Sequence, residues 1–109
     1  MSEFETVPAS EVPADGRILD VREAYEFAEG HAPAAVHIPV EEIPARFQAE
    51  IDPDEDHYVI CRTGGRSVQI AEWLTAQGWS AVFVGGGYDA WIEAGRPLES
   101  STGEEPRVR

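Results

Sequence analysis

Short, mainly apolar runs alternate with helical stretches along this 109-residue chain. Strands of this kind are buried on both faces, and their alternation with helices is typical of a parallel sheet covered by helices on both sides. The sequence therefore predicts an α/β fold, with one doubly wound domain around a mostly parallel central sheet. The predicted strands are residues 17–21, 35–38, 57–60 and 81–84, and the predicted helices are 23–29, 41–50, 65–77 and a short one around Trp91.

The chain has the length of one domain. Residues 1–16 mix acidic residues with two prolines and end in the turn pair Asp15-Gly16, so we expect a lead-in segment of the domain. Residues 17–98 contain every predicted strand and helix and are expected to form the domain itself. Residues 99–109 are polar, which predicts a disordered C-terminal tail.

The charge and the residue usage exclude several classes of function. The net charge is -13, with 21 acidic residues against 8 basic ones, so we expect no nucleic-acid or membrane partner. Every basic residue is an arginine, which excludes Schiff-base chemistry on a lysine. The single cysteine forms no internal disulfide, and the first residues lack the features of a signal peptide, so the sequence predicts a cytoplasmic protein.

One loop gathers the residues suited to nucleophilic chemistry. Thiolates attack more readily than thiols, and nearby cations or a helix N-terminus favour the thiolate. Paired glycines let successive N–H groups point inward as an anion-binding nest, and arginines grip an oxyanion. A cysteine at a strand end is commonly an inert core residue, but this charged, glycine-rich turn favours a functional site. The loop consists of Cys61, Arg62, Thr63, Gly64, Gly65, Arg66 and Ser67, between a predicted strand and a predicted helix.

The three histidines do not suggest a second catalytic or metal-binding centre. His31, His37 and His57 are scattered and have no partner at metal-ligand spacing, so we predict no metal site and no cofactor. A Cys–His pair is not indicated either. A missing general base suits a reaction with an anionic nucleophile and an anionic intermediate better than it suits acyl transfer.

Several motifs, in the correct order between residues 17 and 98, resemble the rhodanese family. Asp20-Val21-Arg22 is similar to the family's Asp-Val-Arg opening, and residues 61–67 are similar to its active-site loop. Residues 30–35 resemble a Gly-His-x-Pro-Gly-Ala turn, except that Ala34 stands where the family has glycine. Residues 86–91 resemble the closing Gly-Gly-x-x-Ala-Trp motif.

The resemblance implies a sulfurtransferase without a cofactor. Cys61 would take the sulfane sulfur of thiosulfate or a similar donor as a persulfide, and would pass it to cyanide or a thiol. The N–H groups from Arg62 to Ser67 would hold the persulfide, and Arg62 and Arg66 would bind the anionic donor. Asp20 and Arg22 would form an ion pair that supports the pocket wall.

Three other functions could use the same loop. A sulfur-carrier or protein-interaction module would accept sulfur from a sulfur-relay partner protein and turn over small donors slowly. Oxyanion reduction would need an external thiol, because the chain has a single cysteine. Phosphatases related to this fold carry an arginine six residues after the cysteine, but here that position is Ser67 and the arginine is Arg66, so we disfavour phosphatase activity.

Overall fold

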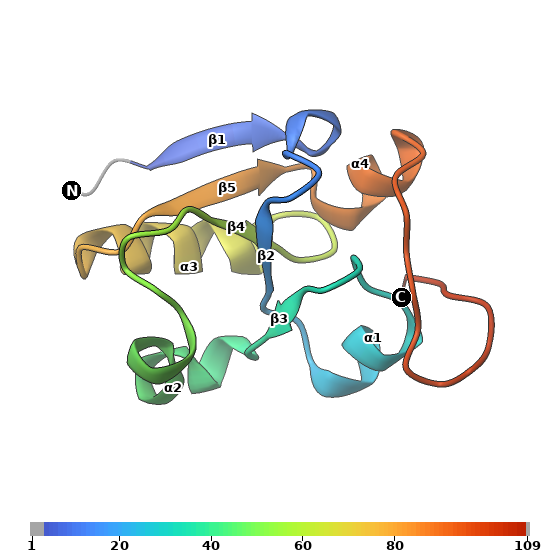
Figure 1. Ribbon diagram of the computed structural model, residues 1–109, viewed down its shortest axis with the longest axis horizontal. Coiled ribbons are helices and arrows are strands. Elements are labelled where there is room, and N and C mark those ends of the chain that lie inside the picture. Colours follow the sequence, from blue (N-terminus) through green and yellow to red (C-terminus); the bar gives the residue numbers. More distant parts are fainter. Residues whose placement is uncertain (1–3, 109) are drawn as a thin grey trace.

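A five-stranded parallel sheet forms the centre of the computed structural model, which describes residues 4–108. The strand order is β1-β5-β4-β2-β3, and every pair of neighbours runs parallel. The α/β prediction is therefore confirmed (Figure 1). The strands are β1 (Glu5–Pro8), β2 (Arg17–Asp20), β3 (Val36–His37), β4 (His57–Ile60) and β5 (Ala81–Gly85).

Two apolar clusters lie on opposite faces of the sheet, because successive strand residues point to opposite sides. Leu19 of β2 packs with residues of α2 (Ile43–Glu50) and α3 (Gly65–Ala76) in one cluster. Its neighbour Ile18 packs with residues of α4 (Gly87–Glu93) in the other. This double burial explains the apolar runs of the central strands.

No helix within residues 4–108 is long and apolar enough to cross a membrane. The helices are α1 (Ala24–Glu29), α2 (Ile43–Glu50), α3 (Gly65–Ala76) and α4 (Gly87–Glu93), with 3-10 turns η1 (Ala9–Glu11) and η2 (Val40–Glu42).

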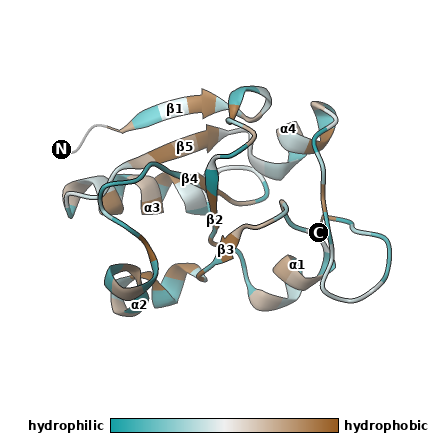
Figure 2. Cartoon of the chain, viewed as in Figure 1, coloured by the Kyte–Doolittle hydropathy of each residue, from teal (hydrophilic) through white to brown (hydrophobic). Residues whose placement is uncertain are grey.

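The lead-in segment contains a strand that the sequence analysis did not predict. β1 pairs with β5, with Glu5 opposite Val82 and Pro8 opposite Gly85. It lies at the edge of the sheet, where its residues remain largely exposed and mix polar with apolar side chains (Figure 2). A proline is tolerated at such an edge. The segment after it contributes Ala9 to the core, so residues 4–16 are an integral part of the domain.

The polar C-terminal segment lies against α1, although the sequence predicts disorder there. Glu99 and His31 exchange two backbone hydrogen bonds of 2.9 Å. A helix leaves its last carbonyl groups without hydrogen-bond partners. Backbone N–H groups of the C-terminal segment donate to two of these carbonyl groups in α1. Hydropathy gives no sign of this packing, since backbone groups make the contacts. The donors and acceptors are Ser101 N to Ala28 O and Arg107 N to Glu29 O, both at 2.8 Å.

Ala34 holds a turn conformation that normally belongs to glycine. Its φ is 64°, and no other non-glycine residue among residues 4–108 has a positive φ. The turn leads from α1 towards β3 and is closed by a 3.2 Å hydrogen bond from Ala35 N to Ala32 O. The chain thus keeps the left-handed turn despite the methyl group at this position.

We expect Ala34→Gly to be more stable than the control Ala14→Gly by about 1 kcal/mol. Glycine relieves the left-handed strain at Ala34, worth about 1 kcal/mol, while its extra freedom in the unfolded chain costs both variants about 0.4–1 kcal/mol. Ala14 is exposed in a turn and has no positive φ, so glycine relieves no strain there. Urea denaturation measures the free energy of unfolding of both variants. An equal loss of stability relative to the wild type in both would contradict the strain assigned to Ala34.

Candidate active site

Cys61 follows β4 directly, and its sulfur faces the start of α3. The side chain is buried, with 1% of its surface exposed. The backbone N–H groups of Gly64 and Ser67 donate to Sγ at 3.2 and 3.4 Å, and Ser67 Oγ lies 3.2 Å from the same sulfur. Donors at a helix N-terminus stabilise negative charge. The loop is therefore arranged to hold an anionic sulfur.

The two loop glycines have different roles. Gly64 has a φ of 130°, and a Cβ there would lie 3.0 Å from Cζ of Phe83. Gly65, the first residue of α3, has an ordinary φ, and a Cβ there would meet no atom within 4 Å. Gly64 is thus the glycine that the loop conformation requires.

The start of α4 holds the loop from the other side. Tyr88 N donates to Cys61 O at 3.0 Å, and Asp89 N donates to Arg62 O at 3.1 Å. Gly87 has a φ of 57°, and a Cβ there would lie 2.3 Å from Cys61 O. The glycine run at residues 85–87 therefore serves as a tight connection that lets α4 pack on the loop that begins at Cys61.

Arg62 and Thr63 lie on the exposed side of the loop. The Arg62 Nε atom is 3.5 Å from Oδ1 of Asp89, and both side chains are more than half exposed. A surface pair of this kind is weak and leaves the arginine free to move.

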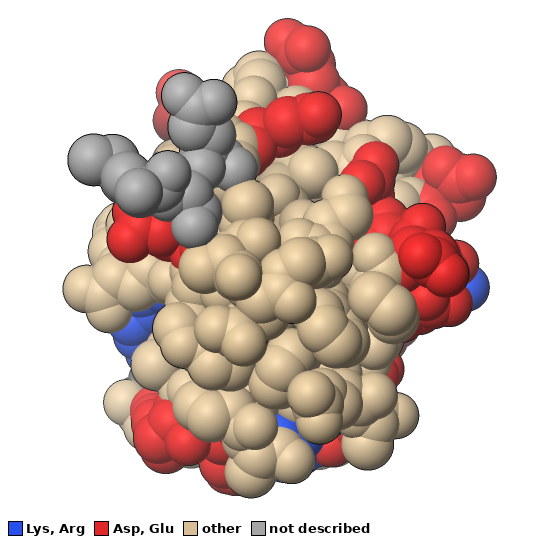
Figure 3. Space-filling model, turned by 90° about the vertical axis from the view of Figure 1, so that its left-hand side faces the viewer, with Lys and Arg blue, Asp and Glu red and all other residues tan. Residues whose placement is uncertain are grey.

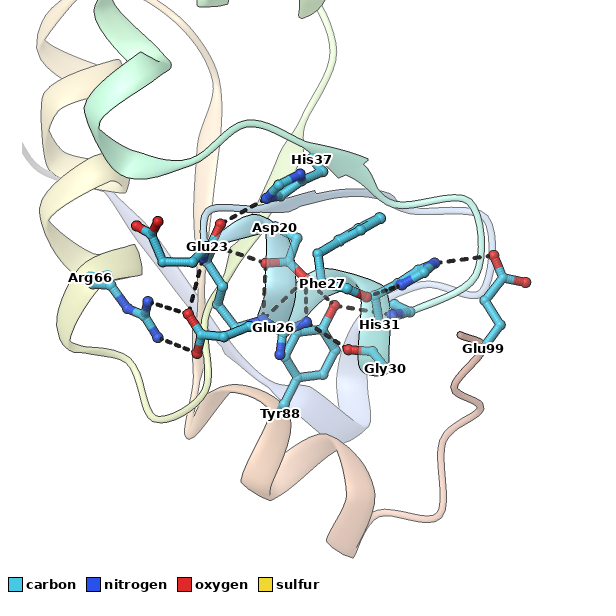
Figure 4. Close-up of polar contacts among 12 residues, drawn as sticks. Asp20, Glu23, Glu26, Phe27, Gly30, His31, His37, Arg66, Tyr88 and Glu99 are labelled. Atoms are coloured by element: carbon cyan, nitrogen blue, oxygen red, sulfur yellow. Dashed lines mark hydrogen bonds and ion pairs between the residues drawn. The ribbon is translucent and has the colours of Figure 1, made fainter. Parts of the chain in front are cut away.

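Arg66 is paired with Glu26 of α1, a residue that the sequence analysis did not select. Its Nη1 and Nη2 atoms donate to Oε1 and Oε2 of Glu26 at 2.8 and 3.1 Å (Figure 4). The Glu26 side chain is 8% exposed, and its Oε1 also accepts the backbone N–H of Glu23 at 3.0 Å. The hydrogen bonds from Arg66 lower the pKa of Glu26, and the same bonds raise the pKa of Arg66. Both members of the pair are therefore charged at neutral pH.

The capping of α1 fixes the position of Glu26. Glu23 and Glu26 form a reciprocal capping box at the first turn of α1, in which each side chain accepts a backbone N–H of the other residue. The Glu-x-x-Glu spacing was the available sequence signal for this box. It gave no indication of the partner, because Arg66 lies 40 residues further along the chain.

Asp20 and Arg22 form the ion pair that the resemblance implied, and both side chains are completely buried. Arg22 Nη2 donates to Asp20 Oδ2 and to Gly30 O, each at 2.7 Å. The Tyr88 hydroxyl donates to the same Oδ2 at 2.9 Å and accepts Ala32 N at 3.0 Å (Figure 4). Burial raises the pKa of Tyr88, so its hydroxyl remains a neutral donor. A role of the pair in the site stays a prediction.

The histidines lie outside the loop. The His31 Nδ1 atom is 2.6 Å from Phe27 O, and the His37 Nε2 atom is 2.7 Å from Arg22 O. Both rings stack with Phe27, which indicates packing roles. Within residues 4–108, no three His, Cys, Asp or Glu side chains are grouped so that they could hold a metal ion.

Comparisons with known proteins identify the family of this chain. A model of the rhodanese-like domain matches residues 8–94. A sulfurtransferase of Allochromatium vinosum is 37% identical over 90 residues, which cover 82% of this chain and 83% of the relative. The thiosulfate sulfurtransferase GlpE of Pseudomonas savastanoi pv. phaseolicola is 38% identical over 96 residues, covering 84% and 90%.

A solved structure shows the same fold. The rhodanese-related protein of Thermoplasma volcanium superposes with a TM-score of 0.82 at 30% identity, covering 88% of this chain and 98% of that one. The family model spans most of this chain, and both sequence relatives exceed 30% identity over more than two thirds of it. The chain therefore belongs to the family of rhodanese-like domains.

Proposed function

We propose that this protein is a sulfurtransferase in which Cys61 carries sulfur as a persulfide between thiosulfate, or a similar donor, and a thiol or cyanide acceptor. The observation that carries the proposal is the set of donors around Cys61 Sγ: the N–H groups of Gly64 and Ser67 at 3.2 and 3.4 Å. Family membership, with relatives named as sulfurtransferases, supports the same reaction class.

The first half-reaction moves one sulfur atom onto the protein. The Cys61 thiolate attacks the outer sulfur of thiosulfate, the S–S bond of the donor breaks, and sulfite leaves with the bonding electron pair. The product is a Cys61 persulfide anion, whose charge the loop N–H groups stabilise. Ser67 Oγ lies within reach of both Sγ and Gly64 O, so it is able to turn its proton towards a charged sulfur.

The second half-reaction regenerates the Cys61 thiolate. Cyanide or a thiolate attacks the terminal sulfur of the persulfide, and the Cys61 thiolate leaves with the electron pair. The product is thiocyanate or the persulfide of the acceptor. The two half-reactions share one covalent intermediate, so the expected kinetics are ping-pong.

A sulfur-carrier role is the second candidate. Only 1% of the Cys61 surface is exposed, which limits the access of small donors. A partner protein that opens the loop on docking would favour sulfur relay between proteins. The single cysteine also fits a reducing compartment, and we propose the cytoplasm.

We expect thiosulfate to add the mass of one sulfur atom to the wild-type protein and not to Cys61→Ser. The intact masses of both proteins, recorded before and after cyanide, check this, because cyanide should remove the added sulfur. A wild type that gains no mass, and whose Cys61 does not react with a small thiol reagent, would contradict the proposed enzymatic activity. A reactive Cys61 that gains no sulfur from thiosulfate would favour the carrier.

We expect Arg66→Ala to raise the KM for thiosulfate by roughly tenfold, because it removes a positive charge and leaves Glu26 unopposed beside the loop. Arg46→Ala is the matched control, since Arg46 pairs with Glu42 and Glu50 along η2 and α2. Steady-state kinetics with cyanide as acceptor measure the effect, and thermal melting checks the fold. An unchanged KM in a folded Arg66→Ala protein is incompatible with a role for Arg66 in donor binding.

A further inference from the structure

Each of the three arginines in the site motifs faces a carboxylate. Arg66 gives both terminal nitrogens to Glu26, and Arg62 lies 3.5 Å from Asp89. Arg22 is completely buried on Asp20. The positive charges of the site are therefore balanced one by one.

Glu26 is the carboxylate whose position affects the loop most directly. It is almost completely buried, and Arg66 and the N–H of Glu23 hold its oxygens in place. Glu23, half-buried in the same capping box, adds a further carboxylate at the start of α1. A group fixed in this way cannot turn towards solvent when a ligand arrives. Any ligand that approaches Arg66 thus also meets the charge of Glu26.

The overall charge acts in the same direction. The chain carries a net charge of -13, and carboxylates also gather along the rim of the face in Figure 3, at the end of the sheet where the strands begin, away from Cys61. Distant charges are screened over about 8 Å at physiological ionic strength. The carboxylates beside the loop therefore matter more than those on the rim. Since a carboxylate offsets each arginine, the remaining groups that attract an anion are the backbone N–H groups at Sγ. These groups suit a single small charge.

We infer that Glu26 is a specificity-determining residue, which makes the site select sulfane-sulfur donors with at most one negative charge over dianionic thiosulfate. The inference rests on the proposed function. Persulfides and thiosulfonates are the chemical class that meets this condition. Glu26 acts by its negative charge, which lies beside Arg66 and offsets it, and Glu26 is not a catalytic residue.

The chemistry with such a donor balances as it does with thiosulfate. In methanethiosulfonate a methyl group replaces one charged oxygen of thiosulfate, so the two donors differ chiefly by one unit of charge. The Cys61 thiolate attacks the outer sulfur, the donor S–S bond breaks, and methanesulfinate leaves with the electron pair. The Cys61 persulfide is the same product in both cases.

The test compares kcat/KM for methanethiosulfonate and thiosulfate, with cyanide as acceptor, in the wild type, Glu26→Gln and Glu50→Gln. Each rate is divided by that of free cysteine with the same donor, which removes the difference in leaving group. Glutamine keeps the capping box at α1. Glu50→Gln makes the same change in net charge at the Arg46 pair on α2.

We expect the kcat/KM of the wild type to be roughly tenfold higher for methanethiosulfonate than for thiosulfate, as expected for one unit charge near the donor. Glu26→Gln should remove most of that preference by raising kcat/KM for thiosulfate. Glu50→Gln should leave the preference unchanged. Higher salt should narrow the wild-type preference, which tests the inference even if Glu26→Gln does not fold.

A change by the same factor for both donors in Glu26→Gln would overturn the inference, because a merely structural role affects both alike. A wild type that prefers thiosulfate would overturn it as well. If neither donor places sulfur on Cys61 of the wild type, the proposed function itself fails. The intact mass separates that result from a loss of selectivity alone.

Discussion

A buried charge must find partners, and the Asp20–Arg22 pair finds them at the end of α1 and in α4. Asp20 ends β2, and Arg22 also binds the carbonyl of Gly30 beyond α1. The Tyr88 hydroxyl from α4 joins the pair and holds the N–H of Ala32. Removing one member of this cluster would leave the other buried charged or polar groups without a hydrogen-bond partner, which destabilises the fold. The cluster thus fixes how α1, α4 and the turn before β3 sit around the end of β2.

Tyr88 links this cluster to the loop that begins at Cys61. Its side chain contacts Asp20, while its backbone N–H holds the carbonyl of Cys61. Glu26 supports the loop from α1, through Arg66. The loop that surrounds the sulfur is therefore held by two helices, both tied to the same buried ion pair. These contacts hold the N–H donors of Gly64 and Ser67 in line with Sγ, as the proposed function requires.

The sequence was sufficient where a pattern is local. The apolar runs predicted the central strands, and the glycine-rich turn predicted the loop that surrounds Cys61 Sγ. Three features depend on contacts between distant segments: the edge strand β1, the packing of residues 99–108 and the Glu26–Arg66 pair. β1 is short and exposed, so it has no apolar signature. An ion pair 40 residues apart becomes visible only once α1 and α3 are placed together.

The position of β1 has a consequence for how the chain folds as it is made. Of the five strands of this sheet, β1 is the first to leave the ribosome and its partner β5 is the last, with Glu5 opposite Val82. Contacts so distant in sequence form slowly, since a long loop must close before they are gained. β1 therefore has no partner strand during most of synthesis. Completion of the sheet is an event that follows the emergence of almost the entire domain.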